Sequence, residues 1–235
     1  ESDGEAAVID PLREPTPYIE RAKKNKAKIK YIFETHIHAD FVSGHLDLAK
    51  KTGATIVFGP NANTHYDCYN AVDGETFKIG SLTLKVMHTP GHTLESVSYL
   101  LIDAAGKNHA LFSGDTLFLG DVGIPDVAQQ YKGLSKEKLA EMLFDSLRSK
   151  IMPLEDNITL YPAHGAGSAC GKNMSKDTIG TLGDQKSSNY ALRADMTKEE
   201  FVSEVLKGIG SPPPYFIENI LLNKKNFVKY CNENK

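Results

Sequence analysis

The feature that most constrains the fold of this sequence is a set of four short turns that each bring histidine or aspartate directly after a run of β-type residues. In chain order they are 35–40 (THIHAD), 88–93 (HTPGHT), 113–116 (SGDT) and 161–165 (YPAHG). Imidazole nitrogens and carboxylate oxygens bind borderline divalent metals, and alternate residues at a strand end can point towards one centre. Four such turns in a chain with only eight histidines predict a metal centre at the edge of a β-sheet.

The pattern of apolar residues predicts strands that alternate with a few helices. The expected strands are 6–10, 29–33, 55–58, 76–79, 82–87, 97–102, 110–112 and 159–161. The expected helices are 16–24, 42–51, 135–150, 198–207 and 215–222, with Ser135 and Thr197 as N-caps. Hairpin turns at 79–81 and 104–106 favour sheets with antiparallel parts over a purely parallel sheet. We therefore expect a mixed α/β fold of the α+β kind.

The chain is expected to divide into a catalytic domain, 1–195, and a C-terminal helical tail or linker, 196–235. Residues 166–195 are rich in Gly, Ser, Lys and Asn and have weak periodicity, so we expect a long loop beside the active site. Residues 1–5 read as a polar turn that leads into the first strand. This start predicts that the fold lacks its first strand.

Composition narrows the range of partners. The net charge of −3 and the pI near 6.3 give no general attraction for nucleic acid or anionic lipid, so we expect a small substrate and neither of those partners. The run of five lysines between 23 and 30 is interpreted as a solvated face. Three widely spaced cysteines without a Cys-x-x-Cys pair indicate a reducing, cytoplasmic setting. No stretch resembles a membrane span.

The four motifs together resemble the metallo-β-lactamase superfamily over about residues 1–195. The resemblance implies an αββα sandwich with a metal site at one edge. Hydrolytic members, including glyoxalase II, carry H-x-H-x-D-H in the first motif and hold two metals. This chain has Phe41 in place of the last histidine. A second metal would keep only Asp40, His164 and the shared Asp115, and this loss favours a single metal.

Longer strings resemble one branch of that superfamily, the persulfide dioxygenases that are often fused to a rhodanese domain. These strings are ETHIHADFVSGH, GDVGIPD and PAHGAGSACG. The resemblance implies one Fe(II) per chain, held by His36, His92 and Asp115. Two imidazoles and one carboxylate leave three cis positions open on non-haem iron, enough for a substrate and O₂ together. The expected reaction converts a thiol persulfide and O₂ to sulfite and thiol, and a rhodanese domain or a second copy of the chain is a possible partner.

Five further residues receive roles around this centre. We expect His38, Asp40 and His164 to orient ligands or water, because hydrogen bonds from outside the ligand shell fix ligand geometry. Phe41 and Cys170 are expected to lie against the substrate. The remaining histidines are interpreted as structural, with His88 the most probable exception because it stands near His92; they are His45, His65, His88 and His109.

Two departures from the branch concern its substrate. Ile124 stands where the branch usually has Arg, and Ala166 stands where glutathione-using members tend to place Tyr. The thiol carrier is therefore left open. Two other functions also remain: a zinc-dependent thioester hydrolase resembling glyoxalase II, against which Phe41 counts, and a non-catalytic metal-binding module. The intact set of His36, His92 and Asp115 counts against the last.

Overall fold

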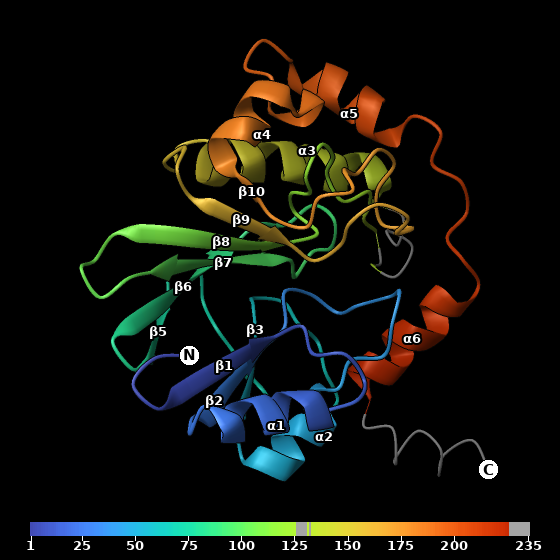
Figure 1. Cartoon of the computed structure of the whole chain (residues 1–235). Coiled ribbons are helices and arrows are strands. Elements are labelled where there is room, and N and C mark those ends of the chain that lie inside the picture. Colours follow the sequence, from blue (N-terminus) through green and yellow to red (C-terminus); the bar gives the residue numbers. More distant parts are fainter. Residues whose placement is uncertain (126–130, 132, 226–235) are drawn as a thin grey trace, which may run out of the picture.

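The computed structural model describes residues 1–125, 131 and 133–225, and arranges them in four layers. Two β-sheets pack face to face, with helices on both outer sides (Figure 1). This order of helix, sheet, sheet and helix confirms the αββα sandwich that the motifs imply.

The lower sheet in Figure 1 has four strands in the order β1-β2-β3-β4, and all of its neighbours are parallel. Its strands are β1 Glu5–Ile9, β2 Lys28–Phe33, β3 Thr55–Phe58 and β4 Tyr69–Asn70. An isolated bridge joins Ser2 to Glu5 beside β1, the edge strand. The prediction that a further strand precedes this turn stays a prediction.

The upper sheet has six strands in the order β10-β9-β8-β7-β6-β5, antiparallel except for the pair β8 and β9. They are β5 Thr76–Ile79, β6 Leu82–His88, β7 Val97–Ile102, β8 Asn108–Gly114, β9 Thr159–Pro162 and β10 Gly180–Thr181. Since β6 and β8 each run antiparallel to β7, and β8 runs parallel to β9, the strands β6, β8 and β9 share one direction. Three of the four motifs therefore leave this sheet at the same edge.

Helices cover the outer face of each sheet. Helices α1 (Thr16–Lys24) and α2 (His45–Thr52) lie under the lower sheet (Figure 1). The upper sheet is covered by α3 (Lys136–Ser146), a π-helical turn η2 (Leu147–Ile151), α4 (Leu182–Ser188), a 3₁₀ turn η3 (Tyr190–Leu192) and α5 (Lys198–Leu206). Helix α6 (Tyr215–Lys224) returns to the lower layer.

Three apolar clusters hold the layers together. Between the sheets, aromatic and aliphatic side chains meet around Phe33 and Tyr99, whose rings lie 4.9 Å apart. A second cluster joins α1, α2 and α6 to the lower sheet, and a third joins α3, η3 and α5 to the upper sheet. Burial of this apolar surface is the main force that stabilises the sandwich.

Most expected elements are present, and the differences have local causes. Helix α2 begins at His45 and not at residue 42, with Gly44 as its N-cap, because the preceding residues form an irregular turn. The expectation of one long loop over 166–195 is corrected by β10 and α4, which follow each other without a gap. The side chain of Thr181 caps α4 by accepting a hydrogen bond from the backbone N–H of Asp184.

The C-terminal segment packs on both layers. Helix α5 contributes Phe201 and Val205 to the upper cluster, and α6 contributes Phe216 and Ile220 to the lower one. The division at residue 195 stays a prediction. Of the helices that the structure describes, none is both long and apolar enough to cross a membrane.

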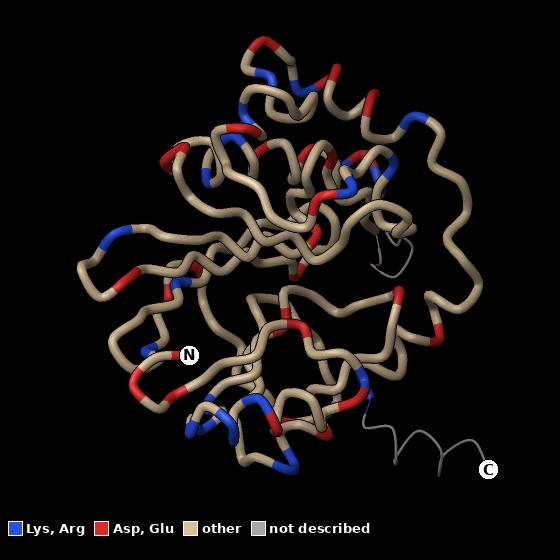
Figure 2. The backbone as a smooth tube through the Cα atoms, in the orientation of Figure 1, with Lys and Arg blue, Asp and Glu red and all other residues tan. Residues whose placement is uncertain are grey.

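The charged residues agree with the interpretation of the lysine run. Four of its five lysines are exposed and lie at and after the end of α1, where acidic residues are mixed among them (Figure 2). This arrangement is typical of a solvated face.

Candidate metal centre

His36, His92 and Asp115 meet at the edge where β2, β6 and β8 end. One potential ligand atom of each lies within 4.8 Å of those of the other two. His92 Nε2 is 3.4 Å from Asp115 Oδ2, and all three residues are at least 97% buried. Neither oxygen of Asp115 has a hydrogen-bond partner. Because a buried carboxylate without partners is unfavourable, this donor set fits a divalent cation.

His36 is oriented by its neighbour Thr35. The Thr35 hydroxyl donates to Asp10 Oδ2 at 2.8 Å and lies 2.9 Å from His36 Nδ1. Since its only hydrogen goes to Asp10, the hydroxyl accepts from His36 Nδ1–H, and Nε2 keeps its lone pair. Burial and the nearby His38 and His92 hold the pKa of His36 well below its usual value. His36 is therefore a neutral imidazole, the form that binds metals.

His92 is oriented by a backbone carbonyl. Its Nδ1 lies 2.8 Å from the oxygen of Ile124, which only accepts, so Nδ1 carries the proton and Nε2 faces Asp115. The N–H of Ile124 in turn donates to the carbonyl of Cys170 at 3.0 Å. Position 124 thus supports the site through its backbone, which isoleucine supplies as well as arginine does.

Gly123 lets this loop approach the centre. A Cβ on Gly123 would stand 2.1 Å from the Asp115 carbonyl oxygen and 3.0 Å from His92 Nδ1. Real side chains do not tolerate such distances to backbone atoms. Glycine is therefore required between Asp115 and His92.

Asp40 and His164 lie on the other side of Asp115. His164 Nε2 is 3.3 Å from Asp40 Oδ2 and 3.5 Å from Asp115 Oδ1. Ligand atoms of Asp40, His164 and Cys170 also form a group compatible with a metal, and Asp40 Oδ1 and His164 Nε2 have no hydrogen-bond partner. Asp115 therefore stands between two groups of potential ligands, with one oxygen towards each.

His38 contacts two carboxylates that the sequence analysis did not select. Its Nε2 lies 3.1 Å from Asp10 and 3.4 Å from Glu34, while its Nδ1 lies 3.9 Å from Asp40. Burial alone would lower the pKa of His38, but Asp10 and Glu34 outweigh it and raise that pKa well above its usual value. Asp10 and Glu34 directly follow β1 and β2. Their position at parallel strand ends, like that of the motifs, was the pattern that could have revealed them.

The other histidines lie elsewhere. His45 is buried, with its Nε2 2.7 Å from the Tyr66 hydroxyl, and His88 Nε2 lies 3.0 Å from the Leu94 carbonyl oxygen. His65 and His109 are exposed. Among the residues that the structure describes, no group compatible with a metal includes any of these four.

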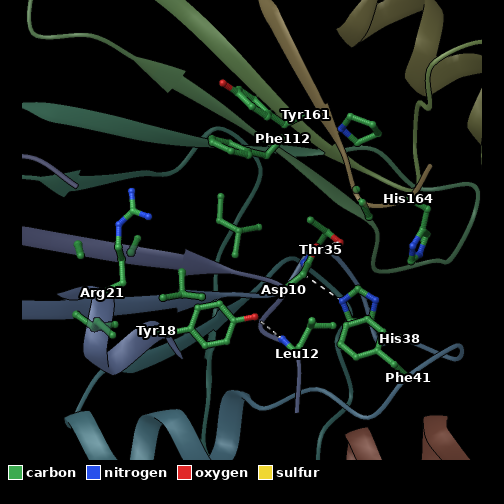
Figure 3. Close-up of a pocket in the computed structure, with 18 of the residues that line it drawn as sticks. Asp10, Leu12, Tyr18, Arg21, Thr35, His38, Phe41, Phe112, Tyr161 and His164 are labelled. Carbon is green, nitrogen blue, oxygen red and sulfur yellow. Dashed lines mark hydrogen bonds and ion pairs between the residues drawn. The ribbon is translucent and has the colours of Figure 1, made fainter. Parts of the chain in front are cut away.

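A cavity of about 670 Å³ opens beside the centre. His38 and Phe41 lie side by side on its wall, with ring centroids 4.4 Å apart, and His164 lies across from them (Figure 3). Phe41 is half-buried and faces this space. Cys170 is 2% exposed and packs in the lower core cluster with Phe118. Of the two residues expected to contact substrate, Phe41 lines the cavity, whereas Cys170 is buried in the core cluster.

Comparison with known proteins places this geometry in a family. The family model described as "Metallo-beta-lactamase superfamily" matches residues 1–66. A hydroxyacylglutathione hydrolase of Rhodopseudomonas palustris (strain BisB5) is 30% identical over 90% of this chain and 84% of its own length. The cytoplasmic hydroxyacylglutathione hydrolase of Arabidopsis thaliana is 32% identical over 70% of this chain and 60% of its own length.

Two solved structures share the fold over nearly the whole chain. A metallo-beta-lactamase from Staphylococcus aureus subsp. aureus COL has a TM-score of 0.86 and 35% identity, covering 94% of this chain and 66% of that one. ETHE1 from Myxococcus xanthus has a TM-score of 0.77 and 26% identity, covering 95% and 89%. The chain thus spans about 60% of the Arabidopsis relative and about two thirds of the Staphylococcus chain. The identity to the Rhodopseudomonas enzyme, the four layers and the metal-compatible edge together establish that this chain belongs to the metallo-β-lactamase superfamily of metal-dependent enzymes.

Proposed function

We propose that this chain is the catalytic domain of a mononuclear iron persulfide dioxygenase. The reaction is R–S–SH + O₂ + H₂O → R–SH + H₂SO₃, in which the terminal sulfur is oxidised, O₂ is reduced and the S–S bond breaks. The observation that carries the proposal is the combination of His36, His92 and Asp115 at one centre with Phe41 in place of a second-site imidazole.

The ligand set suits this chemistry. Two imidazoles and one carboxylate on one side of iron leave neighbouring positions open, whereas zinc hydrolases need only one open position. Iron bound there supplies the electron transfer to O₂ that no side chain of this chain can supply. Thr35 and the Ile124 carbonyl fix the two imidazoles with Nε2 towards the centre.

Phe41 adds a second reason. Its ring lies against His38 and lines the cavity beside Asp40. A phenyl ring has no lone pair with which to coordinate a metal ion or accept a strong hydrogen bond from water, so this side of the centre favours a soft sulfur substrate over a second hydrated metal. His164 and Asp40, which lie 3.3 Å apart, are the polar groups that would orient water for the hydrolysis that releases sulfite.

The proposal also covers the substrate, the cellular location and the partner domain. The substrate is a low-molecular-weight thiol persulfide, and the proposed location is the cytoplasm. A rhodanese domain, which would handle persulfide sulfur, is the proposed partner in the whole protein. Residues 1–195 remain the proposed catalytic unit.

A zinc-dependent thioester hydrolase is the second candidate, and two observations favour it. The relatives from Arabidopsis thaliana and Rhodopseudomonas palustris are named hydroxyacylglutathione hydrolases. Asp40, His164 and Cys170 form a second group of potential ligands, so a thiol from another loop lies within 4.8 Å of the two second-site ligands that remain. The names support this candidate more strongly than the first, and Phe41 supports the first.

Metal analysis and two assays separate the candidates. Protein purified without oxygen should contain about one iron per chain. With glutathione persulfide it should consume O₂ and release an equal amount of sulfite, and it should leave S-lactoylglutathione intact. Two tightly bound zinc ions per chain together with thioester hydrolysis would contradict the dioxygenase proposal and support the hydrolase. Metal without either activity would favour the non-catalytic module.

A further inference from the structure

The turn that carries His36, His38 and Asp40 has little regular backbone pairing. Between β2 and α2 it forms bends without helix or strand. Its polar backbone groups are bonded largely by side chains from other parts of the chain. Asp10 accepts from the N–H of Thr35 at 2.7 Å, and Glu95 accepts from the N–H of Ile37 at 3.2 Å. The position of the turn therefore depends on the elements that supply those side chains.

Helix α6 supplies most of the remaining bonds. The amide nitrogen of Asn223 donates to the carbonyls of His38 and Phe41, both at 2.8 Å, and its oxygen accepts from the N–H of Ser43 at 2.9 Å. Asn219 donates to the carbonyl of Ala39 at 2.9 Å. Residues four apart share one face of a helix, so both amides face the turn. Asn223 is 3% exposed.

The same face of α6 is anchored by apolar packing. Phe216 and Ile220 are 1% and 5% exposed, and they belong to the core cluster that contains Ile37 and Ala39. The apolar side chains fix the distance between the helix and the turn, while the amides fix the register of the turn along the helix. Substitution of Asn223 by an apolar residue would keep the packing and leave three buried backbone groups without partners.

A second series of contacts leads from α6 to His38. The Tyr66 hydroxyl donates to the Asn223 carbonyl at 2.8 Å and lies 2.7 Å from His45 Nε2. His45 Nδ1 is 3.4 Å from Glu34, and Glu34 is 3.4 Å from His38 Nε2. Helix α6 is thus connected both to the backbone of the turn and to a side chain that the turn carries.

We propose that Asn219 and Asn223 are positioning residues of the metal centre, and that α6 acts as a clamp that sets where the turn places His36, His38 and Asp40. The clamp goes beyond the proposed reaction, because it concerns the geometry of the donors whichever reaction follows. In other metal sites, loss of a hydrogen bond that orients a ligand from outside the ligand shell costs about 10- to 100-fold in metal affinity.

Cobalt(II) provides a test that does not depend on turnover, because its visible absorption reports ligand geometry. Asn223→Asp keeps the shape and the acceptor for Ser43 but points oxygen, and no donor, at two carbonyls. We expect about 10- to 100-fold weaker Co(II) binding by calorimetry and displaced visible bands, with far-ultraviolet circular dichroism unchanged. Asn219→Asp removes one bond and should give a smaller change of the same kind, which keeps the test available if the first variant does not fold.

Ile217→Ala is the matched control, since Ile217 lies on α6 but is 57% exposed. It should bind Co(II) with the affinity and spectrum of the unmodified protein. Wild-type affinity and spectrum in both asparagine variants would show that α6 only packs against the fold, and would overturn the proposal. If the asparagine variants weaken Co(II) binding as expected but the unmodified protein loaded with Fe(II) consumes no O₂ with a persulfide, the proposed function is contradicted and the clamp remains.

Discussion

At the scale of single residues, Asp115 is a buried carboxylate that lies between two groups of potential metal ligands. Its two oxygens are buried without a hydrogen-bond partner, and each lies near a different imidazole, His92 or His164. A negative charge held in this way is unfavourable unless a cation is bound beside it. Asp115 therefore favours metal binding, and it lowers the stability of the metal-free fold.

Asp115→Asn tests that link. The amide can donate to the unprotonated Nε2 of His92, so the metal-free variant should be as stable as the metal-free parent or more stable. Metal content should fall to near zero, and O₂ uptake with it. Thermal unfolding in chelator and metal analysis give the two readings, with Asp67→Asn on the exposed surface as the control. Unchanged metal content and turnover would mean that another carboxylate holds the metal.

Phe41 is the residue that separates the two candidate functions. Phe41→His would place an imidazole beside Asp40 and His164, which already lie 3.3 Å apart. We expect an additional zinc-binding step, slow thioester hydrolysis and reduced O₂ uptake. Because Phe41 is half-buried and faces the cavity, the loss of stability should be well below the roughly 3–5 kcal/mol for truncating a fully buried Phe.

Zinc calorimetry on the parent protein, Phe41→His and Phe41→Leu tests whether the residue at position 41 sets the number of bound metals. Phe41→Leu removes the ring without adding a ligand, so it should bind no more zinc than the parent. If Phe41→His also shows no added step, the ring at this position does not determine how many metals the centre holds.

At the scale of elements, the loop after β8 shows how closely backbone and ligands fit. Gly123→Ala should destabilise the protein by about 1–3 kcal/mol or more, because its methyl group overlaps the Asp115 carbonyl and presses on His92. Metal affinity should fall as well. Urea unfolding measures the first effect and calorimetry the second. Gly210→Ala is the control, since its Cβ meets nothing within 4 Å; equal stability of the two variants would contradict this account of the loop.

The elements that could be predicted from sequence are those whose causes are local. Strands with alternating or continuous apolar residues, the Ser135 cap of α3 and the Thr197 capping box of α5 are read from neighbouring residues and agree with the structure. The four turns at strand ends were recognised in the same way, and the structure brings the His and Asp side chains that they carry to one edge; the role of these residues as ligands stays a prediction. Strand β4 and strand β10 were missed, since each has only two residues and depends on its partner strand.

The parts that could not be predicted depend on distant contacts. Asn223 lies in an ordinary helical sequence, and nothing near it indicates a bond to His38. The start of α2 was misplaced for a similar reason: just before Gly44, the N–H of Ser43 donates to Asn223 of α6 and its hydroxyl donates to Glu34, so these residues do not continue the helix. Local patterns describe elements, whereas the contacts between elements decide the fine geometry of the site.

At the scale of the whole molecule, the metal centre joins the two sheets. His36 comes from the lower sheet, whereas His92 and Asp115 come from the upper one. A bound cation therefore acts as a link across the interface between the layers, in addition to the apolar cluster around Tyr99. Its removal should loosen the contact between the sheets at this edge.

Metal removal should accordingly lower the melting temperature. A metal at 100 times its Kd adds about 2.7 kcal/mol, and a chain of this size shifts by roughly 2–4 °C per kcal/mol. We expect a decrease of roughly 5–10 °C in excess chelator, measured by calorimetry. Asp115→Asn should show no such difference. Equal melting temperatures with and without metal in the parent protein would exclude a linking role.

The contact between α6 and the first turn also sets an order of events during synthesis. Asn223 follows His38 by 185 residues, so at the ribosomal rate of about 5–20 residues per second the turn waits roughly 10–40 s for its partner. During that interval the histidine and acidic side chains of the turn lie on a loop that has not yet formed its hydrogen bonds with α6. During this interval chaperones and free metal ions can reach these side chains before the native geometry selects among them.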